Sequence, residues 1–232
     1  LANAYRATGR LNDATPLLEK TLTDRERLLG PDHPDTLASR NNLANAYQAA
    51  GRLNEAIPLF EETLATREEL LGPDHPHTLR SRNNLANAYR ATGRLNDATP
   101  LLEETLEAQT RALGPNHPDT LRSRNNLANA YRAAGRLNDA IPLFEETLEA
   151  LTRVLGPDHP DTLASRNNLA LAYQDAGRLN DAIPLFEETL EAQTRILGPN
   201  HPHTLRSRNN LPMAYAAAGK PFRSEEQPGT SA

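Results

Sequence analysis

Asparagine and arginine side chains recur at fixed spacing along this chain, and their chemistry suits the binding of a peptide. An asparagine amide both donates and accepts hydrogen bonds, so a row of asparagines can hold an extended backbone without reading its side chains. An arginine guanidinium donates two parallel hydrogen bonds to a carboxylate. The densest stretch predicts a peptide-binding groove lined by Arg80, Asn83, Asn84, Asn87, Arg90, Arg122, Asn125, Asn126, Asn129 and Arg132.

A second interpretation of the same asparagines is structural. They would form a solvated polar face, in which asparagines of neighbouring repeats hydrogen-bond to one another. The row is also not uniform, because Leu171 stands where earlier repeats have an asparagine and Asp175 where they have an alanine.

Acidic residues gather on a different helix surface from these arginines. Glutamate pairs recur at residues 61–62, 103–104, 145–146 and 187–188, and we expect them to form a solubilising outer wall. Although the net charge is -5, this division leaves the groove more basic than the exterior, so we expect an acidic peptide or protein segment as the partner. The pI of about 5.8 and the presence of only two lysines argue against nucleic acid.

Histidine also recurs once per repeat, but in a pattern that does not suit a metal site. Neighbouring repeats should place these histidines roughly 10 Å apart, the width of a helix pair, so they cannot converge on one zinc ion. Ser39, His33 and Asp35 have counterparts along the chain, and a catalytic trio duplicated in repeat after repeat is not expected. We therefore predict loop and helix-capping roles, with no metal, no cofactor and no enzymatic activity. The histidines concerned are His33, His75, His117, His159 and His201.

The elements that position these residues follow a period of 42 residues. The period is clearest in the tyrosines, Tyr5, Tyr47, Tyr89, Tyr131, Tyr173 and Tyr215. About five and a half such repeats account for the chain as far as Gly219. Aromatic residues make up only 4% of the chain, which favours an elongated fold with many small local contacts over one deep core.

Each repeat reads as two helices. In residues 30–71, Pro34 suits the first position of a helix and Gly51 suits its C-terminal end. A second helix begins near Leu53, with Asn54 as a candidate N-cap, and its inward stripe includes Arg67 and runs to Leu71. Because a pair of roughly 16 and 18 residues cannot bury its apolar stripe alone, the repeats predict an all-α fold, a right-handed α-solenoid of stacked antiparallel helix pairs.

Arginine also occupies one position of the apolar stripe on each first helix. We expect these side chains to pack their aliphatic stems between helices and to pair their heads with acids. The alternative is partial exposure at the groove floor. The residues are Arg40, Arg82, Arg124, Arg166 and Arg208.

The run Asn42-Leu43-Ala44 … Tyr47 … Gly51-Arg52-Leu53 … Ala56 … Phe60 … Leu64 resembles a tetratricopeptide repeat (TPR). The usual repeat has about 34 residues, and the longer version here is similar to the repeats of kinesin light chains and of bacterial relatives attached to signalling ATPases. The resemblance covers residues 1–219 and implies a TPR superhelix that binds peptides or proteins. Two departures are the arginine on the apolar stripe and the lack of a Walker-type loop.

The two ends carry separate expectations. Leu1 corresponds to Leu43, so the chain opens within a first helix and is expected to be a fragment of a longer protein, able to associate end to end. Pro212 should kink or shorten the last helix. The polar residues 220–232 predict a mostly disordered C-terminal tail.

The remaining features concern the compartment and the alternative functions. The chain has no cysteine, no visible signal peptide and no apolar run of membrane-spanning length, so we expect a cytoplasmic protein with no membrane partner. Only two of its 25 basic residues are lysines, which indicates a GC-rich coding genome and a bacterial source. One alternative function is a structural spacer that assembles through its ends and outer wall. Another is the sensor arm of a larger signalling ATPase of the nucleotide-oligomerisation (STAND) type.

Overall fold

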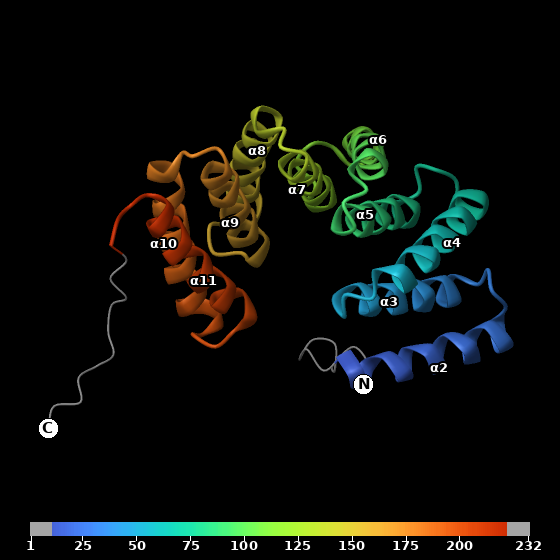
Figure 1. Ribbon diagram of the computed structural model, residues 1–232. Helices are drawn as coiled ribbons and strands as arrows, with labels where there is room; N and C mark the ends of the chain where they lie inside the picture. Colours follow the sequence, from blue (N-terminus) through green and yellow to red (C-terminus); the bar gives the residue numbers. More distant parts are fainter. Residues whose placement is uncertain (1–10, 222–232) are drawn as a thin grey trace, which may run out of the picture. The chain divides into compact units, whose positions relative to one another are not determined.

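The computed structural model describes residues 11–221, and within that range it consists of helices joined by short loops (Figure 1). Helices of 16 and 19 residues alternate, close to the predicted pair. The all-α prediction is confirmed. The helices are α2 (Leu11–Leu29), α3 (Pro34–Ala49), α4 (Leu53–Leu71), α5 (Pro76–Ala91), α6 (Leu95–Leu113), α7 (Pro118–Ala133), α8 (Leu137–Leu155), α9 (Pro160–Asp175), α10 (Leu179–Leu197) and α11 (Pro202–Ala217).

The shorter helices begin with a histidine cap followed by proline. At α3, Nδ1 of His33 accepts a hydrogen bond from the backbone N–H of Asp35 at 3.1 Å, and Pro34 occupies the first turn, where a missing N–H costs nothing. The same cap recurs at α5, α7, α9 and α11. The predicted capping role of these histidines is therefore confirmed.

The turn inside each pair is closed by glycine. Gly51 adopts a φ of 74°, and the N–H of Arg52 donates to the carbonyl of Tyr47 at 2.8 Å, as in a Schellman motif. The expectation that Asn54 caps the next helix is wrong. Because the turn is so short, α4 already begins at Leu53, and the first turn is instead stabilised by an ion pair between Arg52 and Glu55.

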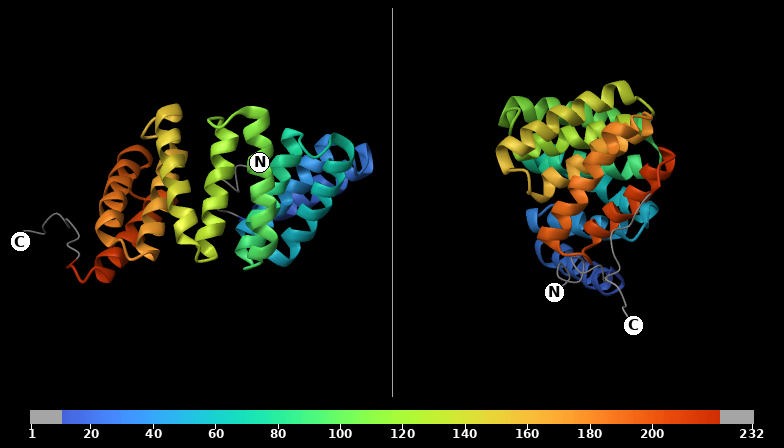
Figure 2. Two further views of the ribbon diagram at one scale, coloured as in Figure 1. Left: turned by 90° about the horizontal axis from the view of Figure 1, so that it is seen from above. Right: turned by 90° about the vertical axis from the view of Figure 1, so that its left-hand side faces the viewer.

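The chain divides into two compact units, residues 1–134 and 135–232. In the first unit each helix from α2 to α7 packs on the next one. We call the shorter helix that opens each pair a first-type helix and the longer one a second-type helix. The first-type helices α3, α5 and α7 also touch from repeat to repeat. In the second unit α8 to α11 pack in the same order. Figure 2 shows this stacking of successive helices within each unit. The predicted α-solenoid of antiparallel helix pairs is confirmed.

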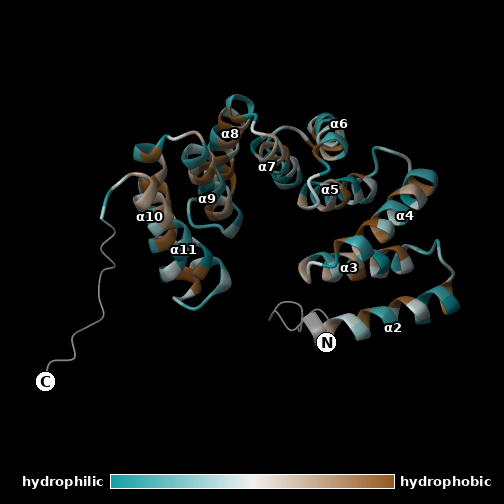
Figure 3. Ribbon diagram, viewed as in Figure 1, coloured by the Kyte–Doolittle hydropathy of each residue, from teal (hydrophilic) through white to brown (hydrophobic). Residues whose placement is uncertain are grey.

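The core of each unit is a thin layer between the helices. Phe60, Phe144 and Phe186 are completely buried at the same position of their repeats, and Leu102 fills that position in α6. Apolar and polar residues alternate along every helix in Figure 3, as expected for helices that are buried on one side only. Leu71, which the sequence placed on the inward stripe, is instead 41% exposed at the end of α4.

Pro212 does not shorten the last helix. Helix α11 has the same 16 residues as its counterparts, although Pro212 lacks the N–H that would continue the hydrogen-bond ladder. Its neighbours Leu211 and Ala214 are buried, and this packing holds the helix. The expectations for residues 1–10 and 222–232, including the opening half-helix and the disordered tail, lie outside the described residues. No helix in residues 11–221 is long and apolar enough to cross a bilayer.

The stripe arginines behave in two ways. Arg40 pairs with Glu26 at 2.9 Å and Arg82 with Glu68 at 2.6 Å, as predicted. In the next repeat, Thr110 stands in the place of Glu26 and Glu68. Arg124 there donates instead to the carbonyl of the loop residue Pro115, 3.4 Å away. Arg208 makes the same type of contact at 3.2 Å. The acid partner is thus specific to the first two of these positions.

Candidate peptide-binding surface

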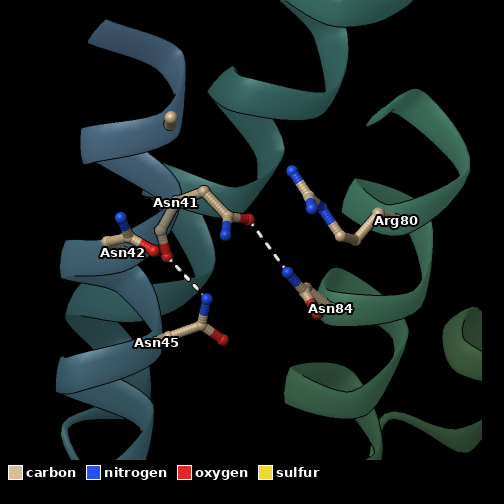
Figure 4. Close-up of a pocket in the computed structure, with 6 residues that line it drawn as sticks. Asn41, Asn42, Asn45, Arg80 and Asn84 are labelled. Carbon is tan, nitrogen blue, oxygen red and sulfur yellow. Dashed lines mark hydrogen bonds between the residues drawn. The ribbon is translucent and has the colours of Figure 1, made fainter. Parts of the chain in front are cut away.

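A pocket of about 500 Å³ opens between α3 and α5 in the first unit. Figure 4 shows its polar lining, with the asparagines of α3 on one side and Arg80 and Asn84 of α5 on the other. Two of the ten predicted groove residues, Arg80 and Asn84, thus lie together in one cavity. The lining of this α3–α5 pocket is Ala38, Asn41, Asn42, Asn45, Arg80 and Asn84.

One row of asparagines joins neighbouring repeats to one another. Asn84 donates through Nδ2 to Oδ1 of Asn41 at 2.9 Å, and Asn126 donates to Asn83 in the same way at 3.2 Å. In the second unit, Asn210 donates to Asn167 at 3.1 Å. The structural interpretation of the asparagines therefore holds for these pairs.

The predicted groove residue Asn83 belongs to this internal row. It is 6% exposed, and its Nδ2 also donates to the hydroxyl of Ser123 at 2.6 Å. Its amide is used to hold α5 against α7, so it is not available to a ligand. Asn83 is therefore a structural residue and not a candidate ligand contact.

A second row remains partly open to solvent. We call Asn45, Asn87 and Asn129 the asparagine face; all three are half-buried, one per repeat on α3, α5 and α7. Asn45 and Asn129 each donate to the carbonyl four residues earlier, at 2.8 and 2.9 Å. The side-chain oxygen and one N–H of Asn45 and of Asn129 are not used in these bonds. The side chain of Asn87 makes no hydrogen bond to any described residue. These are the groups that a peptide backbone needs.

The four predicted arginines differ in how far the fold neutralises them. Arg122 pairs with the carboxylate of Asp119. Arg80 is exposed, and its nearest polar contact is Nδ1 of His77, 3.1 Å from Nη2. Arg90 and Arg132 are half-buried, and burial, reinforced by the charge of Arg132, lowers the pKa of Arg90.

Arg67, on the inward stripe of α4, adds a further cation. It is 3% exposed, and its Nη1 donates to the Ser81 hydroxyl at 2.6 Å and to the His77 carbonyl at 3.3 Å. Burial, together with the nearby charge of Arg80, lowers its pKa to about 10. No carboxylate among the described residues pairs with Arg67. Its positive charge therefore adds to that of Arg80 beside the pocket.

The remaining groove residues occupy intermediate positions. Asn125 and Asn126 are half-buried on α7, where they correspond to Asn83 and Asn84 of α5. The buried and the open asparagines differ in their direction from the helix axis, since Asn41 and Asn45, four residues apart, lie about 40° apart around the helix. The sequence alone did not reveal which row faces the neighbouring helix.

The outer glutamates carry a contact that sequence reasoning missed. The hydroxyl of Tyr89 donates to Glu61 at 2.6 Å, and Arg94 lies over the Tyr89 ring, 3.9 Å from its centroid. Tyr47 bonds to Glu19 in the same way. Burial and this hydrogen bond raise the pKa of Tyr89 to about 12. The first glutamate of each pair is thus a structural partner of the next repeat as well as a surface acid.

Comparison with known proteins identifies the repeats. The family model for the tetratricopeptide repeat matches residues 1–69, 40–111, 83–152, 125–194 and 164–225. A crystal structure of a Podosopora anserina protein named for kinesin light chain, with nearly identical TPR-like repeats, is 36% identical, with a TM-score of 0.68, over 84% of this chain and 92% of that one.

Two more distant structures share the fold alone. BtubC (BKLC) of P. vanneervenii is 22% identical over 90% of this chain and 84% of that one, with a TM-score of 0.71. The apo form of RapI is 12% identical over 94% and 81%, with a TM-score of 0.67. No curated protein matches the chain in sequence. The chain therefore belongs to the tetratricopeptide repeat family, and its 42-residue repeats are of the kinesin-light-chain-like type.

Proposed function

We propose that this array is a non-catalytic interaction module that binds an extended, acidic peptide or protein segment along α3, α5 and α7. The family supports the general role, because tetratricopeptide repeats form protein-interaction scaffolds. The observation that carries the specific proposal is the α3–α5 pocket, where open asparagine amides lie beside Arg80, a cation with no acid partner among the described residues.

The chemistry divides between amides and cations. The asparagine face offers donors and acceptors to a peptide backbone in an extended conformation. Arg80 and the buried charge of Arg67 favour a carboxylate in the pocket, and a locally positive surface raises the association rate of an acidic segment. The proposed contact set is Arg80, Asn84, Asn87, Arg90, Arg122, Asn125, Asn126, Asn129 and Arg132, extended by Asn42 and Asn45 of the pocket.

The test is binding of a diverse peptide library to the wild-type chain and to an Asn87→Ala/Asn129→Ala variant. A matched control is Asn54→Ala/Asn96→Ala, which removes two exposed asparagines from the second-type helices. We expect acidic peptides to be enriched by the wild type and the control and lost by the first variant. Circular dichroism checks that all three proteins are folded. Equal enrichment by all three would overturn the groove proposal.

Assembly is the second candidate function, and one observation favours it. Leu205 and Met213 on α11 are 41% and 63% exposed, whereas the equivalent Leu163 on α9 is 1% exposed. An exposed apolar surface of this kind favours association with another chain. Light scattering over a range of concentrations tests it, and a monomer at every concentration would contradict it.

A further inference from the structure

Near-identical repeats offer a ligand several equivalent positions, so something must select the register. The second residue of the first-type helices differs in charge from repeat to repeat. It is aspartate in α3, α7 and α9 but histidine in α5 and α11, namely Asp35, His77, Asp119, Asp161 and His203. The residue three positions later, one helical turn on, is Ala38, Arg80, Arg122, Ala164 and Arg206.

The exchange decides whether the arginine is neutralised. In α7, Asp119 pairs with Arg122 within one turn. In α5 the same position holds His77, whose pKa is lowered by burial and by the charge of Arg80, so the ring is neutral near pH 7. A neutral imidazole cannot cancel the charge of Arg80. Arg80 and Arg122 thus have the same place in the repeat but different net charge around them.

A second exchange provides the space. The α3–α5 pocket is lined on the α3 side by Ala38, whose methyl group leaves room in front of Arg80. In the following step, from α5 to α7, the place of Ala38 is taken by Arg80 itself. Between α3 and α5, the small residue Ala38 on one helix therefore faces the same pocket as Arg80 on the other, an arginine with no acid partner within residues 11–221.

The same combination occurs once in the second unit. Ala164 of α9 and Arg206 of α11 stand in the places of Ala38 and Arg80, above the hydrogen bond from Asn210 to Asn167. Arg206 is exposed and has no acid partner among the described residues. Leu171 stands where the first pocket has Asn45, so an apolar side chain replaces an amide at this place in the repeat.

We propose that the change from aspartate to histidine at positions 77 and 203 sets the register within each unit, by leaving Arg80 in the first unit and Arg206 in the second as separate anchors for a ligand carboxylate. This inference rests on the proposed function, because it names the anchor within the same binding surface. The anchoring carboxylate belongs to an aspartate or glutamate side chain or to the end of a peptide chain, which share the same recognition chemistry.

The chain itself provides the test substitution, since aspartate already occupies this position after the same histidine cap in α3, α7 and α9. We expect His77→Asp/His203→Asp to weaken binding of the library-selected acidic peptide about fivefold, as the loss of an exposed ion pair would. Asn54→Asp/Asn96→Asp adds the same charge at exposed positions on α4 and α6, and should leave the affinity unchanged. The affinity of the His77→Asp/His203→Asp variant should also depend less on salt.

The outcomes separate the two proposals. If the wild type binds and the Asn87→Ala/Asn129→Ala variant does not, but His77→Asp/His203→Asp binds as tightly as the wild type, the register inference is overturned and the proposed function stands. If the wild type binds no acidic peptide, the proposed function itself fails. Amidating the peptide's C-terminus, or replacing its acidic side chains by amides, shows which carboxylate is the anchor.

Discussion

Nδ2 of Asn84 lies 2.9 Å from Oδ1 of Asn41, so a hydrogen bond that joins two repeats also forms part of the α3–α5 pocket (Figure 4). The proposed binding surface and the interface between repeats therefore share side chains. A ligand in the pocket touches groups whose positions are already held by the packing of α5 on α3, and little ordering is needed on binding.

The two asparagine rows should respond differently to truncation. Asn83→Ala removes a buried amide that bonds to Ser123 and Asn126, so we expect the free energy of unfolding to fall by ~1–3 kcal/mol. Asn87→Ala, on the open row, should change it by less than ~0.5 kcal/mol. Urea denaturation followed by circular dichroism measures both. Equal losses for the two variants would contradict the distinction between the rows.

The core position filled by Phe144 should tolerate leucine but not alanine. Phe144→Ala leaves a cavity at a completely buried site, at an expected cost of ~3–5 kcal/mol. Phe144→Leu should cost clearly less, because Leu102 is equally buried at the same position of α6. Thermal unfolding of the two variants decides the order, and a leucine variant as unstable as the alanine variant would refute it.

Tyrosine ionisation should limit stability at high pH. The pKa values of Tyr47, Tyr89 and Tyr173 are raised to about 12 by burial and by their glutamate partners, against 10.0 for an unperturbed tyrosine. Because the unfolded chain loses these protons first, stability is fully present below pH 10 and declines as the pH rises towards 12. Tyrosinate absorbance should show these rings ionising late, and ionisation of all tyrosines near pH 10 in the folded protein would argue against the contact.

The buried charge of Arg67 should matter more for binding than for folding. Arg67→Gln copies Gln109, which accepts a hydrogen bond from the Ser123 hydroxyl at the place where Arg67 donates one to the Ser81 hydroxyl. The variant should therefore remain folded and near wild-type stability. Its affinity for acidic peptides should fall, because one cation beside Arg80 is lost. Calorimetric titration measures the affinity. An unchanged affinity in a folded variant would remove Arg67 from the account.

Much of the fold could be predicted because its determinants are local. The 42-residue period, Pro34 at a helix start and Gly51 at a helix end each depend on backbone preferences within a few residues. Asn54 was misassigned as a cap because the short turn after Gly51 starts the helix two residues earlier than that assignment required. The unshortened α11 shows tertiary packing overriding the local effect of Pro212.

The proposed binding surface was harder to predict from the sequence, because it depends on contacts between repeats. Asn83 and Asn87 are one helical turn apart, and only the packing of α5 against α7 decides that the first is buried and the second is open. The bond from Tyr89 to Glu61 spans 28 residues and requires two neighbouring repeats in contact. Arg67 was placed correctly on the inward stripe, but its proximity to Arg80 emerged only from the stacked helices.

The central claim is that this surface binds acidic segments through Arg80 and the asparagine face. The most direct measurement is the affinity of one library-selected acidic peptide, and of its copy with amides in place of the carboxylates, for the wild type and for Arg80→Ala. We expect the acidic peptide to bind the wild type more tightly than its amide copy, with an affinity that falls as salt rises, and we expect Arg80→Ala to remove this preference. Equal binding of the two peptides to the wild type, at low and at high salt, would contradict the account.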